Sequence, residues 1–95
     1  MNTEQMLAKI IQQSKEEILQ DINSDVVPKN VTSFAQLQDY VDANCYGGLC
    51  ENKLFDELLE HFGGRDEHEG MPEGMIDFIN KVQTSIDNWI SNGMN

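Results

Sequence analysis

The sequence predicts an all-α fold, a small bundle or array of about four helices that forms one domain over residues 1–95. Apolar residues recur at spacings of three and four along most of the chain, which is the period of an amphipathic helix. Glycine pairs at 47–48 and 63–64 follow two of these stretches, at the positions where helices end. The alternation of apolar and polar residues that is typical of strands is rare, so no sheet is expected.

The first helix is predicted from residue 3 to about residue 22. Thr3 is expected to cap it, with Glu4 in the positively polarised first turn. Ser14 interrupts the apolar stripe of this helix. Residues 23–32 are expected to form an extended connector, because Pro28 disfavours a helical conformation of the residue before it. The apolar stripe consists of Met6, Leu7, Ile10, Ile11, Ile18, Leu19 and Ile22.

Two further helices are predicted to form a hairpin around Gly47-Gly48. Ser33 and Gln36 have the spacing of a capping box, so the second helix is expected to begin there and to run to the glycine pair. The third helix is expected to end at Gly63-Gly64. The apolar face of the second helix is Phe34, Leu37, Tyr40, Val41 and Cys45, and that of the third is Leu54, Phe55, Leu58, Leu59 and Phe62.

The last helix has the most regular pattern and is expected to follow an exposed, charged loop at 63–70. Pro72 is predicted at its first position, with Glu73 beside it, and Asn92-Gly93 at its end. Trp89 is expected to pack in the core rather than to face a partner. The apolar face consists of Met75, Phe78, Ile79, Val82, Ile86, Trp89 and Ile90.

The net charge of −11, from 17 acidic and 6 basic residues, argues against binding to nucleic acid or to an anionic membrane surface. The basic residues are spread singly along the chain, so they form no cluster that could hold a phosphate backbone. No apolar run approaches the length of a membrane span, and no secretory signal precedes the first helix, so the cytoplasm is expected.

The cysteines and histidines raise the question of a zinc or thiol site at Cys45, Cys50 and His61. His61 and His68 are too widely spaced for the usual ligand pair. Both cysteines fall on predicted apolar faces, which favours buried free thiols over metal ligands. No motif supplies a catalytic set either. We therefore expect no metal, no cofactor and no enzymatic activity.

The negative charge is concentrated after residue 32, where nine of the eleven excess charges lie. A rigid helical pair with a following loop would present these carboxylates to a basic surface of another protein. The residues expected to contact such a partner are Asp39, Asp42, Asp56, Glu57, Glu60, Asp66, Glu67 and Glu69. Solubility alone is an equally simple explanation for the charge.

Residues 27–51, and above all the segment from Ser33 to Asn44 with the following Gly47-Gly48, resemble small acidic proteins of bacteria, phages and other mobile elements. The resemblance implies a bacterial or phage setting and carries no site residues with it.

The sequence thus predicts a non-enzymatic, acidic protein-interaction module that binds or blocks a basic, nucleic-acid-binding surface of another protein. Two alternatives remain open. One is a structural homo-oligomer joined by apolar surface that a small core leaves uncovered. The other is the zinc or thiol site at Cys45, Cys50 and His61.

Overall fold

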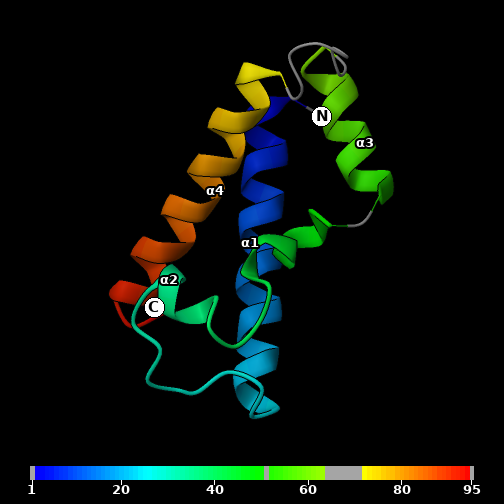
Figure 1. Cartoon of the computed structure of the whole chain (residues 1–95). Helices are drawn as coiled ribbons and strands as arrows, with labels where there is room; N and C mark the ends of the chain where they lie inside the picture. Colours follow the sequence, from blue (N-terminus) through cyan, green and yellow to red (C-terminus); the bar gives the residue numbers. More distant parts are fainter. Residues whose placement is uncertain (1, 51, 64–71, 95) are drawn as a thin grey trace.

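The computed structural model describes residues 2–50, 52–63 and 72–94, and this part of the chain is helical with no strand, which confirms the predicted all-α class. The elements are α1 (Thr3–Asn23), α2 (Phe34–Leu37), the 3₁₀ element η1 (Ala43–Gly48), α3 (Asn52–His61) and α4 (Glu73–Ser91). The long helices α1 and α4 pack against each other, η1 lies across α1, and α2 contacts α4 (Figure 1). None of the described helices combines the length and the apolar character needed to cross a membrane.

Helix α1 begins as predicted, but its cap is Asn2 rather than Thr3. Asn2 Oδ1 accepts a hydrogen bond from the Gln5 backbone N–H at 2.8 Å, and Gln5 Oε1 accepts one from the Asn2 N–H at 3.1 Å. This reciprocal pair satisfies two amide donors that a helix start otherwise leaves without partners.

The second predicted helix is wrong in length. Helix α2 ends at Leu37, and the chain resumes a helical path only at η1. Gln38 Oε1 accepts a hydrogen bond from the Ala43 backbone N–H at 2.8 Å, which replaces helical bonding across the break. Tyr40, expected on the buried face, is 54% exposed. Because η1 stands where the second helix was expected to continue, the predicted helical hairpin is wrong as well.

The start of α2 confirms half of the predicted capping box. Ser33 Oγ accepts from the Gln36 backbone N–H at 3.0 Å. The Gln36 amide oxygen, however, accepts from the backbone N–H of Thr32 at 2.7 Å, not from Ser33. The connector predicted at 23–32 begins one residue later, because α1 includes Asn23, and it contains neither helix nor strand. It is not simply extended: Asp25 has a φ of 61°, and the Val31 N–H donates to the Pro28 carbonyl oxygen in a turn.

Helices α3 and α4 lie where the sequence predicts them. Gly63 follows α3 with a φ of 105°, and Gly93 follows α4 with a φ of 86°. Pro72 is the residue before α4 rather than its first residue, a shift of one position. The predicted charged loop lies almost entirely at 64–71, outside the described residues.

The core forms between α1, α4 and the segments that join them. Trp89 is 9% exposed, as expected of a core residue, and Lys15 Nζ lies 5.6 Å from the centroid of its ring. Removing such apolar side chains from water is the main contribution to folding. The buried apolar residues are Ile10, Ile18, Ile22, Val27, Val31, Leu37, Ala43, Tyr46, Leu58, Leu59, Met75, Phe78, Val82, Ile86, Trp89 and Ile90.

Candidate functional site

The crossing of η1 over α1 depends on two small residues, Ser14 and Gly47. Ser14 is fully buried, and its hydroxyl donates to the Ile10 carbonyl oxygen at 2.7 Å. Gly47 has a φ of 75°, and a Cβ built on it would lie 2.6 Å from Ser14 Oγ and 2.9 Å from the Ile10 carbonyl oxygen. Only glycine permits so close an approach of the two backbones. The serine that interrupts the apolar stripe therefore marks the crossing point.

Two carboxylates of α1 bind η1 at this crossing. Glu17 Oε2 accepts from the Gly47 backbone N–H at 3.1 Å. The Tyr46 hydroxyl donates to Asp21 Oδ2. Burial raises the pKa of Tyr46 well above its usual range, and the hydrogen bond to Asp21 and the negative charges of Asp21 and Glu17 raise it further. These acidic residues hold η1 in place rather than extend into solvent.

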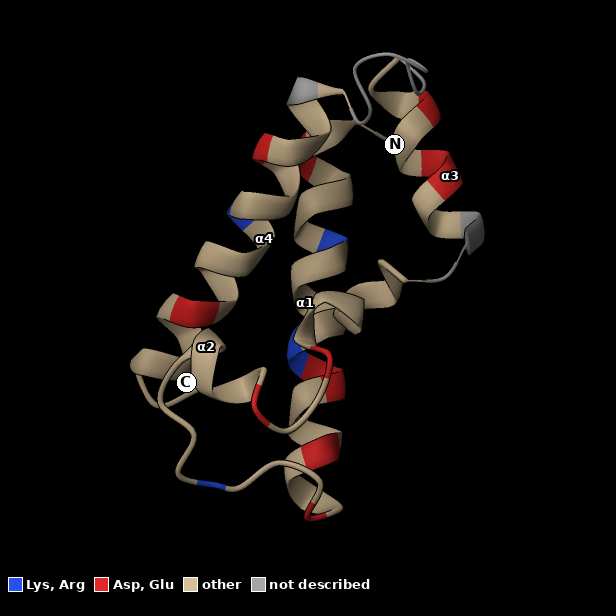
Figure 2. Ribbon diagram, viewed as in Figure 1, with Lys and Arg blue, Asp and Glu red and all other residues tan. Residues whose placement is uncertain are grey.

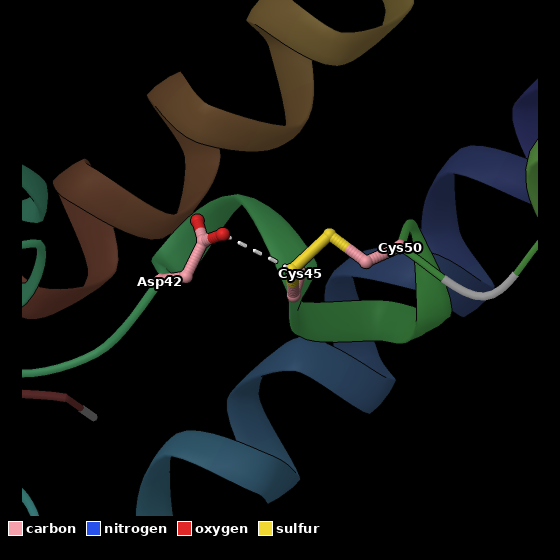
Figure 3. A group of neighbouring side chains, drawn as sticks. All are labelled: Asp42, Cys45 and Cys50. Carbon is pink, nitrogen blue, oxygen red and sulfur yellow. Dashed lines mark hydrogen bonds between the residues drawn. A yellow bond between two sulfur atoms is a disulfide. The ribbon is translucent and has the colours of Figure 1, made fainter.

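Cys45 and Cys50 form a disulfide, so the prediction of free, buried thiols is wrong (Figure 3). The predicted apolar face to which Cys45 was assigned does not exist, because the helix breaks before it. Cys45 is partly buried and Cys50 is exposed. Asp42 Oδ2 lies 3.4 Å from Cys45 Sγ. While the disulfide is closed, neither sulfur is a thiolate that could act as a nucleophile or bind a metal.

The zinc alternative with His61 is not supported by this geometry. His61 Nε2 is 2.8 Å from Thr3 Oγ1, at the start of α1, and its ring packs edge to face on Phe62. Among the described residues, the potential metal-ligating atoms that lie close together belong to Asp42, Cys45 and Cys50, all within 4.8 Å of one another. The carboxylate that accompanies the two sulfurs is thus Asp42.

A groove of about 580 Å³ lies between α1 and α3, and the glycines of η1 also line it. Its apolar lining comes from Met6, Ile10 and Leu54. Glu57 and Glu60 line it from α3. The remaining lining residues are Lys9, Gln13, Gly47, Gly48 and His61. The sequence did not indicate this groove, because its lining comes from α1, η1 and α3, which are far apart along the chain.

The structure distributes the predicted partner residues over separate elements. Asp39 and Asp42 are exposed on the segment before and at the start of η1. Asp56, Glu57 and Glu60 are exposed along α3. Figure 2 shows these acidic residues with those of the C-terminal half of α1. The other predicted contacts lie outside the described residues, as does His68; they are Asp66, Glu67 and Glu69.

Three carboxylates with defined hydrogen-bond partners were missed by the sequence reasoning, namely Glu17, Asp21 and Asp87. Asp87 Oδ1 accepts from the Phe34 backbone N–H at 2.8 Å and so joins α4 to the start of α2. Glu17 and Asp21 are four residues apart, which places them on the same face of α1. Together with the interruption at Ser14, that spacing is the signal of a polar face that binds a second segment.

Neither a protein-family model, nor a curated protein, nor a solved structure matches this chain. The residues of the site are therefore the guide to its function.

Proposed function

We propose that this chain is a non-enzymatic protein-interaction module whose groove between α1 and α3 binds a basic segment of a partner protein. The observation that carries the proposal is the composition of the groove. Met6, Ile10 and Leu54 offer an apolar lining, while Glu57 and Glu60 place negative charge on the α3 side. A segment with one large apolar side chain flanked by lysine or arginine would match both features.

The charges on the two sides of the groove would also orient the bound segment. Lys9 lines the groove from α1, whereas the carboxylates line it from α3. Basic residues of the partner would therefore face α3, and an acidic or polar residue would face α1. Asp56 is exposed on α3 beside Glu57 and would extend the negative side.

The overall net charge of −11 supports the same choice of partner. Long-range attraction by such a charge speeds the encounter with a basic surface and repels acidic competitors. If the partner's basic segment normally holds DNA or RNA, this protein would block it by occupying the same site. The cytoplasmic location and the bacterial or phage setting expected from the sequence belong to this proposal.

The homo-oligomer alternative would use exposed apolar side chains instead. Val26 and Tyr40 are both about half exposed and line one hollow near the end of α1. Ile76, 45% exposed, is in the first turns of α4, at the opposite end of the molecule (Figure 1). Leu19, 42% exposed in the last turns of α1, is the fourth such side chain. Because Ile76 is remote from the other three, the four form no single continuous self-association face, which favours partner binding.

The test begins with peptides selected from a random display library on the folded protein. The expected peptides carry an apolar residue flanked by lysine or arginine. Their affinity should fall steeply between about 0.05 M and about 0.5 M salt, because screening weakens exposed charge pairs. The double variant Glu57→Gln/Glu60→Gln should weaken binding about tenfold, the effect of losing two partly exposed ion pairs.

A matched control removes the same net charge away from the groove, in the double variant Glu16→Gln/Asp77→Asn. Both of its residues are exposed, and neither lines the groove. Equal weakening by both double variants would contradict the groove as the site, and salt-insensitive binding would contradict its electrostatic basis. The blocking version further requires that DNA or RNA compete for the same partner protein.

A further inference from the structure

The short segment that carries the disulfide is fixed to α1 by bonds that do not involve sulfur. The Gly47 N–H donates to Glu17, and the Tyr46 hydroxyl donates to Asp21. The Gly47 backbone also packs directly on Ser14. These contacts do not depend on the disulfide, so Tyr46 and Gly47 are expected to keep their places in the reduced protein.

Reduction of this disulfide leaves two thiols next to a carboxylate. An external dithiol transfers two electrons and two protons to the Cys45–Cys50 bond and is itself oxidised to a disulfide. Cys50 is an exposed residue, which makes the disulfide accessible to such a reductant. Once the S–S bond is broken, the two sulfur atoms separate to van der Waals distance, about 3.7 Å, which is also the spacing of two thiolates on one tetrahedral zinc ion.

We propose that the reduced protein binds one Zn²⁺ through the thiolates of Cys45 and Cys50 and the carboxylate of Asp42. The three donor atoms already lie within 4.8 Å of one another (Figure 3). Two sulfur ligands and one oxygen ligand suit zinc, which accepts Cys and Asp together, better than they suit magnesium or calcium. Binding releases the two thiol protons, and water takes the fourth position.

Two features favour zinc over two free thiols at this place. The cysteines are separated by four residues, which is within the spacing of zinc-binding cysteine pairs. Glu17 and Asp21, both bound to η1, add negative charge that attracts a cation. The closed disulfide has no thiolate, so zinc binding and the oxidised state exclude each other. This inference uses no groove residue and does not depend on the proposed function.

The experiment titrates Zn²⁺ into the full chain in competition with a chromophoric chelator, after reduction with a phosphine and again after oxidation. The reduced protein should bind one zinc per chain, and the oxidised protein none. Co²⁺ in place of zinc should give thiolate-to-metal charge-transfer absorption and the visible bands of tetrahedral cobalt. The Asp42→Asn variant should bind zinc at least about tenfold more weakly, since even the loss of an outer partner of a ligand costs that much.

Asp39→Asn is the matched control, because Asp39 is an exposed acid three residues from Asp42 that lies outside the ligand group. It should bind zinc as the unaltered protein does. Circular dichroism of each variant establishes that it is folded. The inference is overturned if reduction does not increase zinc affinity, or if the two variants behave alike. A stoichiometry of one zinc per two chains, which indicates four thiolates from two molecules, would overturn it too.

Discussion

Ser14 Oγ and the Gly47 backbone meet so closely that a Cβ on Gly47 would lie 2.6 Å from that oxygen. The two residues are 33 positions apart in the sequence, and their contact is where η1 crosses α1. The crossing positions the disulfide, the Tyr46 hydroxyl and the two glycines that line the groove. A side chain at position 47 should therefore disturb all three.

Gly47→Ala should lower the free energy of unfolding by about 3 kcal/mol, because it combines a strained positive φ with steric overlap against α1. Gly63→Ala is the control, since Gly63 also has a positive φ but nothing lies within 4 Å of its added Cβ. Its cost should be about 1 kcal/mol, from backbone strain alone. Urea denaturation measures both values, and equal losses would show that crowding at the crossing contributes nothing.

Tyr46→Phe should lower the free energy of unfolding by about 1.5–3 kcal/mol at neutral pH, the value of a hydrogen bond to a charged acceptor. The phenol pKa is raised in the folded state, so the folded protein holds this proton at a pH where the unfolded chain, with a pKa of about 10, has lost it. The stability that Tyr46 contributes is thus complete below about pH 10 and is lost as pH rises toward the folded-state pKa.

The measurement is urea denaturation at a series of alkaline pH values for the unaltered protein and Tyr46→Phe. The difference in stability between them should shrink as the pH rises above about 10. The Tyr40→Phe variant leaves Tyr46 as the only tyrosine. Its phenolate absorbance should rise only at pH values well above the ordinary tyrosine pKa of about 10. Ionisation of Tyr46 at its ordinary pKa would contradict the contact with Asp21.

Asp87→Ala should destabilise the protein by about 1.5–3 kcal/mol, because the Phe34 N–H loses a charged acceptor at the start of α2. Asp87→Asn keeps an amide oxygen at the same place and should cost less than half as much. Thermal unfolding followed by circular dichroism compares the two. If alanine and asparagine gave the same loss, the effect would come from the negative charge and not from the hydrogen bond.

Reducing the disulfide should lower the free energy of unfolding by about 2 kcal/mol, the entropy effect expected for a loop closed between cysteines five positions apart. Because η1 has its own bonds to α1, amide exchange at Gly47 should remain slow relative to the connector at 24–32. Hydrogen exchange with and without a phosphine reductant measures this. Exchange at Gly47 as fast as in the connector would show that the disulfide alone holds η1.

The long helices were predictable because their apolar stripes extend over several turns. In these helices the local pattern and the packing favour the same structure. The second helix was mispredicted from a spacing of the same kind. Helical periodicity there included Tyr40, which is 54% exposed, and Cys45, which is bound to Cys50. The segment contains Asp39, Asp42 and Asn44, all poor helix formers. Its contacts with α1 are with residues far away in the sequence, and they outweigh the local preference.

The candidate site was less predictable than the fold. Two cysteines five positions apart are compatible with free thiols, a metal pair or a disulfide, and only their positions in space decide. The acidic residues could be counted from the sequence, but counting could not separate Glu17 and Asp21, which bind η1, from Glu57 and Glu60, which line the groove. That distinction depends on contacts across 25 or more positions of the chain.

Helix α4 determines when the core can be completed during synthesis. It supplies Met75, Phe78, Val82, Ile86, Trp89 and Ile90 to the core, and Asp87 and Ser91 bind the residues around α2. During synthesis, α1 and η1 can meet as soon as the first half of the chain has emerged from the ribosome. The apolar surfaces of α1 and η1 then stay exposed to water until α4 has been synthesised. The nascent chain therefore passes through a partly folded, aggregation-prone state, and the rate of translation sets how long that state lasts.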